Sequence, residues 1–386
     1  MKRSTDRILT THVGSLARPK DLLETMREKE HGRPYDREAY ARRIRTAVAD
    51  VVRKQVECGI DVVADGEQGK VSFASYVVER LDGFEPSSGR NEMPASWMRE
   101  IEQFPDYYND YLKKYSAAVS PISTMVCTGP IAYRGEEAVQ TDIANLKAAM
   151  EGLSVEEAFM PAIVPYGFTR NEHYKSEEEF VEALGEALRV EYKAIIDAGL
   201  LLQVDDPMLT EIVSDDPATT PEQRRRAAEQ HVEAVNHALR DLPRDRIRYH
   251  TCYGLNHGPR LHDAPMKAWV DLMLKVNATG YSFEVANPRH MHEWHIWESV
   301  KLPEGRVLIP GFLGHANNFV EHPELIADQI LDYAGLVGRE NVLAGADCGF
   351  SSRATFAPEV NAEVVWPKFQ ALAEGARLAS ARLWRD

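Results

Sequence analysis

The chain alternates short apolar runs with long amphipathic segments, and this alternation restricts the fold more than any other feature. Residues 36–59 have apolar side chains at helical spacing and end at Gly59, after which residues 60–67 begin as an apolar run. Residues 176–198 and 200–207 repeat the same order around a second glycine. A helix, a glycine and a buried strand in this order form half of a βαβ unit. The alternation therefore predicts an α/β protein with a parallel sheet.

Three of the strand-like runs end in residue types that bind metals. Residues 247–252 end in His250 and Cys252, whose side chains point the same way because alternate residues of a strand share a face. Two further runs end at Glu284 and Cys348. A lone histidine and cysteine at this spacing are more often unrelated, since a free cysteine commonly packs as a small hydrophobe. The repetition at three strand ends favours a tetrahedral zinc site built from these four residues.

Metal ligands at the carboxyl ends of successive strands are typical of a parallel barrel with its active site on one face. We therefore predict a single (β/α)8 TIM barrel, with residues 1–386 as one catalytic domain. The chain has one strand-like run more than such a barrel uses, and we place residues 122–133 outside it as a hairpin. Residues from about 71 to 120 interrupt the alternation. We expect them to form an insertion with short helices that covers the barrel mouth.

Charge and cysteine content restrict the function classes. The 386 residues have a formal net charge of −15, which argues against nucleic acid or an anionic membrane as the main partner. The 4 cysteines are too few and too scattered for a disulfide framework, and the metal site needs two of them as thiolates. The polar N-terminus has no signal-peptide pattern, and no apolar run is long enough to span a membrane. We expect a cytoplasmic protein.

Several motifs resemble those of the cobalamin-independent methionine synthase superfamily, in its C-terminal catalytic barrel. They are His250-Thr-Cys252, Glu284 after an apolar run, and Asp347-Cys348-Gly349. Longer segments look closest to epoxyalkane:coenzyme M transferase, a branch of the same superfamily, and these are residues 11–15, 252–259 and 283–294. The similarity runs from about residue 7 to about residue 380, which is nearly the whole chain. The resemblance implies the same barrel architecture, with zinc as the cofactor.

The resemblance also implies roles for residues outside the metal site. The residues that match the amino-acid-binding positions of methionine synthase are Ser15, Glu67 and Asp205. His315 matches a histidine that moves a proton to the departing group, which suits an imidazole because its pKa lies near neutral pH. Arg289 lies in a segment that matches the coenzyme M branch, and its guanidinium, or that of Arg260, would bind a sulfonate or carboxylate in bidentate fashion. We interpret the neighbouring Asp65 and Asp206 as loop caps.

Two thiolates, one imidazole and one carboxylate make an electron-rich zinc that suits a bound thiol better than the activation of water. We therefore predict a zinc-dependent thiol alkyltransferase. A small thiol such as homocysteine or coenzyme M would attack a methyl or alkyl/epoxide carbon as a zinc thiolate, and methyl transfer to homocysteine would belong to methionine biosynthesis. The alternatives are a zinc-dependent lyase or decarboxylase on the same barrel, and a zinc-binding regulatory protein without turnover. The sequence leaves open the thiol, the electrophile and whether the protein is a homo-oligomer.

Overall fold

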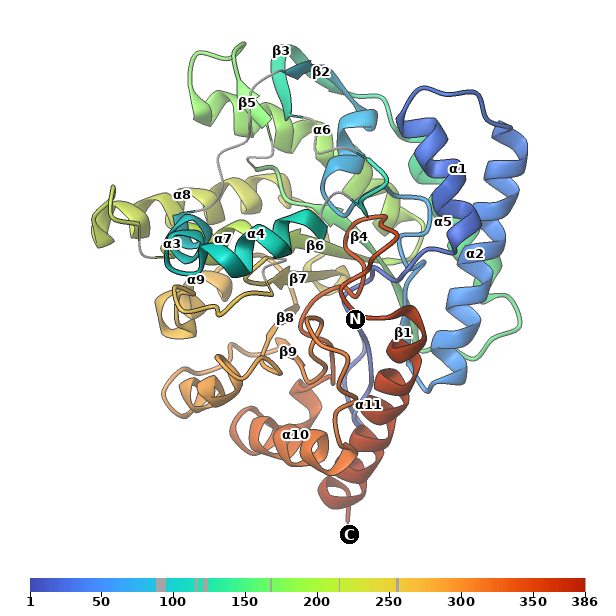
Figure 1. Cartoon of the computed structure of the whole chain (residues 1–386). Coiled ribbons are helices and arrows are strands. Elements are labelled where there is room, and N and C mark those ends of the chain that lie inside the picture. The colour runs from blue at the N-terminus through green and yellow to red at the C-terminus, as the bar shows by residue number, and fades with distance from the viewer. Residues whose placement is uncertain are drawn as a thin grey trace.

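The centre of the molecule is a curled parallel sheet of six strands in the order β1–β4–β6–β7–β8–β9 (Figure 1). The computed structural model describes residues 1–87, 95–114, 117–120, 124–166, 169–214, 216–254 and 257–385. The strands of this sheet are β1 (Val62–Val63), β4 (Glu157–Ile163), β6 (Leu201–Asp206), β7 (Ile247–Thr251), β8 (Gly280–Glu284) and β9 (Val307–Gly311). All five neighbouring pairs are parallel, which confirms the α/β class and the strand direction predicted from the alternation.

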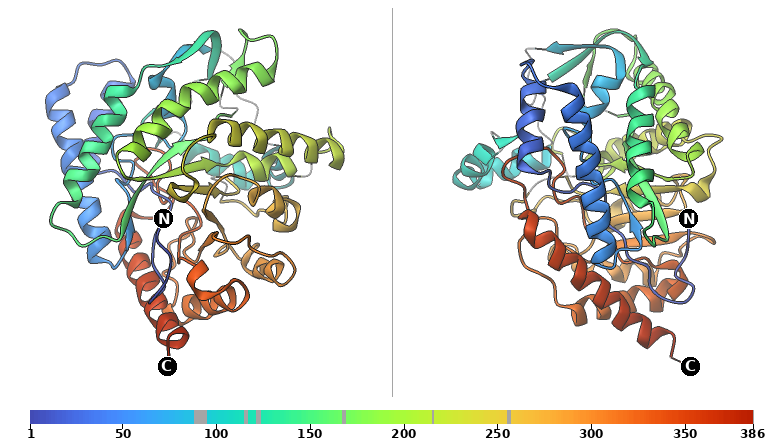
Figure 2. Two further views of the ribbon diagram at one scale, coloured as in Figure 1. Left: turned by 180° about the vertical axis from the view of Figure 1, so that it is seen from behind. Right: turned by 90° about the vertical axis from the view of Figure 1, so that its right-hand side faces the viewer.

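Helices of different lengths pack around the outside of the sheet (Figure 2). They are α1 (Lys20–Glu30), α2 (Arg37–Glu57), α5 (Glu136–Met150), α6 (Glu177–Asp197), α7 (Met208–Val213), α8 (Pro221–Ala238), α9 (Val270–Met273), α10 (Pro323–Val337) and α11 (Ala362–Leu383). Short 3-10 turns are η1 (Ser75–Arg80), η3 (Arg244–Arg246), η4 (Met266–Ala268), η5 (Met291–Glu298) and η6 (Arg339–Asn341). The side chains of Asp36 and Ser176 accept hydrogen bonds from backbone N–H groups at the starts of α2 and α6. Both helices begin directly after these capping residues and lie within the predicted segments 36–59 and 176–198.

Residues 10–11 and 342–345 form two short segments at the two edges of the sheet. Single parallel bridges join each segment to the neighbouring edge strand and join the two segments to each other. The bridged pairs are Leu308–Val342, Gly311–Gly345, Thr10–Ala344 and Thr11–Val62. Gly311 permits this close approach, because a Cβ atom there would lie 2.3 Å from the backbone nitrogen of Asp347. Apolar side chains from the sheet and from both segments form one buried cluster, whose members are Leu9, Val62, Ala64, Phe159, Leu201, Val307, Ile309 and Leu343. The six strands and the two segments thus share one interior.

A second, three-stranded sheet lies beside the first and contains β2 (Leu81–Ser87), β3 (Thr124–Tyr133) and β5 (Thr169–Asn171). β2 and β3 are antiparallel, so the run that we placed outside the parallel sheet does pair there from Thr124 onward. Residues 121–123, which include its predicted start, lie outside the described residues.

Two short helices, α3 (Ala95–Gln103) and α4 (Pro105–Lys114), lie in front of the parallel strands in Figure 1. They contact the loop that follows β7: the Tyr107 hydroxyl donates to the carbonyl of His257 at 2.7 Å, and the N–H of Leu261 donates to Glu100 at 2.5 Å. The extent of the insertion, from about residue 71 to 120, stays a prediction, and residues 88–94 and 115–116 within it lie outside the described ranges.

The first and last segments of the chain contact each other. The N–H of Ile8 donates to the Ser380 hydroxyl at 2.9 Å, and the indole N–H of Trp384 donates to the carbonyl of Thr5 at 3.1 Å. Ser380 belongs to α11, so this helix packs against the strand-like segment that begins the chain. Among the described helices, none has both the length and the apolar character that a membrane span requires.

Candidate metal and substrate site

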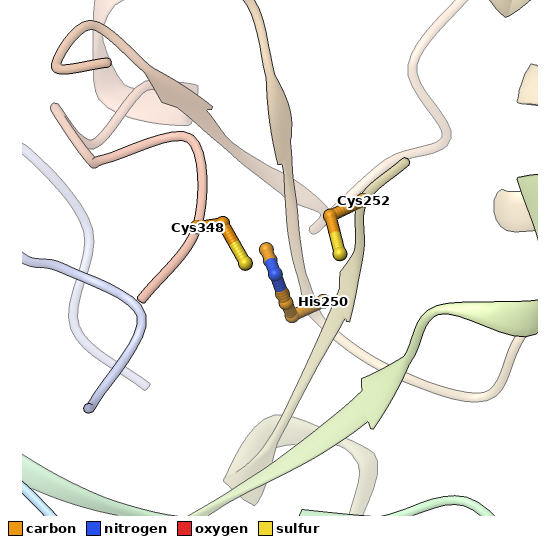
Figure 3. A group of neighbouring side chains, drawn as sticks. All are labelled: His250, Cys252 and Cys348. Atoms are coloured by element: carbon orange, nitrogen blue, oxygen red, sulfur yellow. The ribbon is translucent and has the colours of Figure 1, made fainter. Parts of the chain in front are cut away.

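Three ligand-type side chains converge where β7 ends and the bridging segment 342–345 leaves the sheet. His250 lies in β7, Cys252 follows this strand directly, and Cys348 follows the bridging segment. One ligand atom from each residue lies within 4.8 Å of the other two, and all three residues are buried. Figure 3 shows that the three side chains point toward one another. The alternation of β7 explains the pairing of His250 with Cys252, because both side chains leave the backbone on the same side.

The electrostatics of these three residues suit a metal ion. His250 Nδ1 lies 3.1 Å from the Ser282 hydroxyl, whereas its Nε2 is buried without a hydrogen-bond partner among the described residues. The hydrogen bond from Cys348, followed by His250, lowers the pKa of Cys252 to about 6, while the pKa of Cys348 is raised well above its usual value by the same hydrogen bond and by burial. Two sulfur atoms thus lie beside an imidazole nitrogen that has no hydrogen-bond partner among the described residues. Two sulfurs and one imidazole nitrogen are donors that zinc prefers, so the residues fit this metal.

Glu284, the fourth predicted ligand, lies beside this group but is engaged elsewhere. Its Oε1 accepts the N–H of Tyr253 at 3.1 Å, and its Oε2 lies 3.3 Å from a guanidinium nitrogen of Arg260. Its carboxylate belongs to a second cluster with His315 and Asp347, in which the three ligand atoms also lie within 4.8 Å of one another. The structure therefore gathers three of the predicted ligands and places Glu284 in an ion pair next to them.

The residues predicted to bind an amino acid, Ser15, Glu67 and Asp205, line one narrow cavity together with the three gathered ligands. Glu67 has a backbone φ of 53°, which is unusual for a residue with a side chain. Its Oε2 accepts no hydrogen bond among the described residues and lies 3.7 Å from Arg18. Burial raises the pKa of Glu67 to about 7 and that of Asp205 to about 6. Two buried carboxyl groups thus face the cavity next to the metal ligands.

Arg289 and His315 line a different cavity, of about 270 Å3, between the loops that follow β7, β8 and β9. Arg289 is exposed, and its Nε donates to the carbonyl of Arg260 at 3.3 Å. His315 is buried, and neither ring nitrogen has a hydrogen-bond partner among the described residues. Burial, and then the positive charge of Arg260, lower the pKa of His315 to about 3, so the ring is neutral at pH 7. The predicted site residues are therefore divided between two cavities.

Comparison with known proteins identifies the family. Residues 8–364 match the family described as cobalamin-independent synthase, catalytic domain. The chain belongs to this family. It is similar to the methionine synthase of Saccharolobus islandicus, with 24% identity over 385 residues that cover 97% of this chain and 96% of that protein. The methionine synthase of Sulfolobus acidocaldarius is 23% identical over 342 residues, which cover 88% of this chain and 85% of that protein.

Solved structures of family members have the same fold. A B12-independent methionine synthase from Shewanella sp. W3-18-1, in complex with selenomethionine, superposes with a TM-score of 0.73 at 19% identity and covers 98% of this chain and 99% of that chain. A putative vitamin-B12 independent methionine synthase from Listeria monocytogenes gives a TM-score of 0.65 at 20% identity, covering 98% and 100%. The match of residues 8–364 to the family confirms the superfamily predicted from the motifs, and the solved structures show the same fold.

Within this family fold, sequence reasoning gave no role to Asp347, although it stands in the motif that contains Cys348. Its Oδ1 accepts the N–H groups of Val285 and Ala286 at 2.7 and 2.8 Å, which fixes the loop after β8. Burial, and then the neighbouring Glu284, raise the pKa of Asp347 well above its usual value. The position of Asp347 in the Asp-Cys-Gly motif, next to Cys348, is the sequence feature from which a role for it could have been inferred.

The two aspartates that we interpreted as loop caps do accept backbone N–H groups. Asp206 Oδ1 accepts those of Met208 and Leu209, and Asp65 Oδ1 accepts that of Glu67. Asp206 Oδ2 also lies 2.6 Å from His231 Nε2. Both interpretations are confirmed.

Proposed function

We propose that the protein is a zinc-dependent transferase that moves a methyl group, or a related alkyl group, to the sulfur of homocysteine. The observation that carries this proposal is the convergence of His250, Cys252 and Cys348 within 4.8 Å, with a buried imidazole nitrogen that has no hydrogen-bond partner in the described part of the chain. Membership of the cobalamin-independent synthase family and the methionine synthases among its relatives support it.

His250, Cys252 and Cys348 would hold the zinc ion, and we propose Glu284 for the fourth position. Bound zinc would lower the pKa of the substrate thiol and so supply a nucleophilic sulfur near neutral pH. Ser282 orients the imidazole through Nδ1 at 3.1 Å, which leaves Nε2 for the metal.

The cavity beside these ligands favours a thiol that carries an amino group. Glu67 and Asp205 are buried carboxyl groups with raised pKa values, and an ammonium group between them would favour their ionised forms. Ser15 lies in the same cavity and supplies a hydroxyl. Homocysteine has an amino group, whereas coenzyme M has none and has a sulfonate that two carboxylates would repel. The cavity therefore supports homocysteine over coenzyme M.

The second cavity suits the group donor. Arg289 would attract an anionic group of the donor, and His315 lies inside near the reacting end. Burial keeps His315 neutral before the transfer, so it would take up the proton that the substrate thiol releases and hand it to the departing atom as negative charge develops there. This charge-dependent proton transfer is the role that we propose for His315.

We further propose that the parallel sheet closes as an eight-stranded barrel, in which residues 8–14 and 342–347 supply the two remaining strands. The four single bridges and the shared apolar interior support this closure. We also propose one catalytic domain with an insertion at about residues 71–120 over the mouth, and a reducing cytoplasmic location that keeps the two thiols reduced. A zinc-dependent lyase or decarboxylase is the weaker alternative, because zinc held by two thiolates and an imidazole suits a bound thiol better than the activation of water.

Zinc X-ray absorption of the zinc-loaded protein tests the proposal. Addition of homocysteine should replace one oxygen ligand by sulfur, and coenzyme M should do so only at much higher concentration. Methyl or alkyl transfer to the same thiol should then be detected by mass spectrometry. A zinc shell that stays unchanged with homocysteine, coenzyme M and simple alkanethiols would exclude a thiol transferase.

A further inference from the structure

The carboxylate of Glu284 lies between two sets of groups, the proposed metal ligands and the hydrogen-bond donors of Tyr253 and Arg260. It ends β8 next to the cluster of His250, Cys252 and Cys348, yet its two oxygens are held by the N–H of Tyr253 at 3.1 Å and by Arg260 at 3.3 Å. Both groups come from the loop after β7, the strand that supplies two of the metal ligands. The guanidinium and a metal ion would compete for this carboxylate, because either cation stabilises it only at short distance. A carboxylate held by the guanidinium is therefore less available to the metal.

Arg260 is itself held firmly in this position. Its backbone φ is 58°, a conformation that residues with side chains seldom adopt and that persists only where the surroundings hold it. The side chain is buried, and its Nε donates to Asp263 Oδ2 at 2.6 Å. The guanidinium thus bridges two carboxylates, Asp263 on one side and Glu284 on the other.

A second loop supports the same arrangement. Asp263 Oδ2 lies 3.0 Å from His290 Nε2, and His290 Nδ1 lies 2.9 Å from Glu293. The ring of His290 stacks on Tyr253, with centroids 3.9 Å apart. Glu293 in turn accepts the N–H of Met266 at 2.7 Å. A chain of alternating charges therefore runs from the loop after β8, through Arg260, to the carboxylate beside the metal ligands.

We propose that Arg260 is a positioning residue that competes with the metal for Glu284 and so keeps the fourth metal position open to the substrate thiol. This inference rests on the proposed metal site. A Glu284 carboxylate that gave up the metal would find the Arg260 guanidinium already in place, so it would not remain as an unpaired buried charge. The function of Arg260 is then to make the exchange of oxygen for sulfur on the metal favourable.

A double-mutant cycle on zinc affinity tests the competition without any thiol. Zinc affinity is measured by chelator competition in the wild type, Arg260→Gln, Glu284→Gln and the double variant. Arg260→Gln should tighten zinc binding about tenfold, the effect of freeing one charge-assisted hydrogen bond, and should have much less effect when Glu284 is also changed. Equal effects in both backgrounds, or weaker zinc binding in Arg260→Gln alone, would overturn the proposal.

The same variants separate this inference from the proposed function. In zinc X-ray absorption, Arg260→Gln should need about tenfold more homocysteine than the wild type to replace oxygen by sulfur, and Arg260→Lys should recover part of the difference. Arg246→Gln, which removes a charge near the opposite end of β7, is the matched control and should behave as the wild type. An unchanged homocysteine requirement in Arg260→Gln would contradict the inference. Coupling in the zinc cycle together with no sulfur exchange in the wild type would uphold the competition and reject the proposed transferase.

Discussion

The substitution Glu67→Gln should make the protein more stable while it weakens the binding of homocysteine. Burial raises the pKa of Glu67 from 4.5 to about 7, so the folded state opposes ionisation of this carboxyl group. A difference of about 2.5 between the pKa values of the unfolded and folded states corresponds to about 3 kcal/mol. Glutamine has nearly the same shape and no charge, so the variant avoids this cost.

The sign of the effect depends on pH in a defined way. Below pH 4.5 the carboxyl group is protonated in both states, and the substitution should change the free energy of unfolding little. Between pH 4.5 and 7 the unfolded state loses its proton first, so the wild type loses stability relative to the variant. Above pH 7 the full difference of about 3 kcal/mol should be present. Urea denaturation at pH 4 and pH 8 measures both limits.

The effect of Glu67→Gln on binding is tested with homocysteine and with 4-mercaptobutanoate, which lacks the amino group. Glu67→Gln should weaken homocysteine about 10- to 100-fold, the usual effect of losing a hydrogen bond to a charged group, and should leave 4-mercaptobutanoate unaffected. Calorimetry on the zinc-loaded proteins compares the two thiols. The reasoning fails if the variant is no more stable than the wild type at pH 8, or if both thiols lose affinity equally.

Three further predictions follow from the site. Cys252→Ser and Cys348→Ser should each lose zinc by metal analysis, since a hydroxyl replaces a charged sulfur, whereas Cys127→Ser should retain it; the reverse pattern would place the metal elsewhere. His315→Ala should keep stoichiometric zinc and slow transfer about 100-fold in a steady-state assay, and a loss of zinc would show a structural role instead. The carboxylates of Asp263 and Glu293 raise the pKa of His290 to about 9. His290→Gln should therefore have a lower melting temperature than the wild type at pH values below 6.5, and this difference should shrink as the pH rises through 9. A difference that does not depend on pH would contradict the prediction.

The sequence predicted those features of the protein that depend on residues close to one another in the chain. The starts of α2 and α6 follow from capping residues, and the convergence of His250 with Cys252 follows from strand alternation. The placement of Glu284 did not follow, because its partner Arg260 lies 24 positions away and is oriented by a network spread over two loops. The neutrality of His315 was equally hidden, since burial is a property of the whole fold and the sequence shows only an ordinary histidine in a loop.

The strand-like segments at the two ends of the chain were predicted as full strands, and the structure records them as single bridges. Thr10 and Thr11 are each paired once, so the ladder there is shorter than hydrophobic runs of this length predict. The apolar content of these segments indicated that they are buried. The number of β-sheet pairs that they form depends instead on where the adjacent strands lie in the fold.

The contact between the first and last segments has a consequence for biosynthesis. Thr10 bridges to Ala344, and Cys348 follows this bridge far along the sequence from His250 and Cys252. A nascent chain therefore contains His250 and Cys252 long before it contains the third metal donor. We expect the ion to be bound with high affinity only after Cys348 has been synthesised and Thr10 has paired with Ala344. A chain that stops before Cys348 would contain only His250 and Cys252 of the three donors, so its weaker zinc binding would distinguish it from a chain that contains all three.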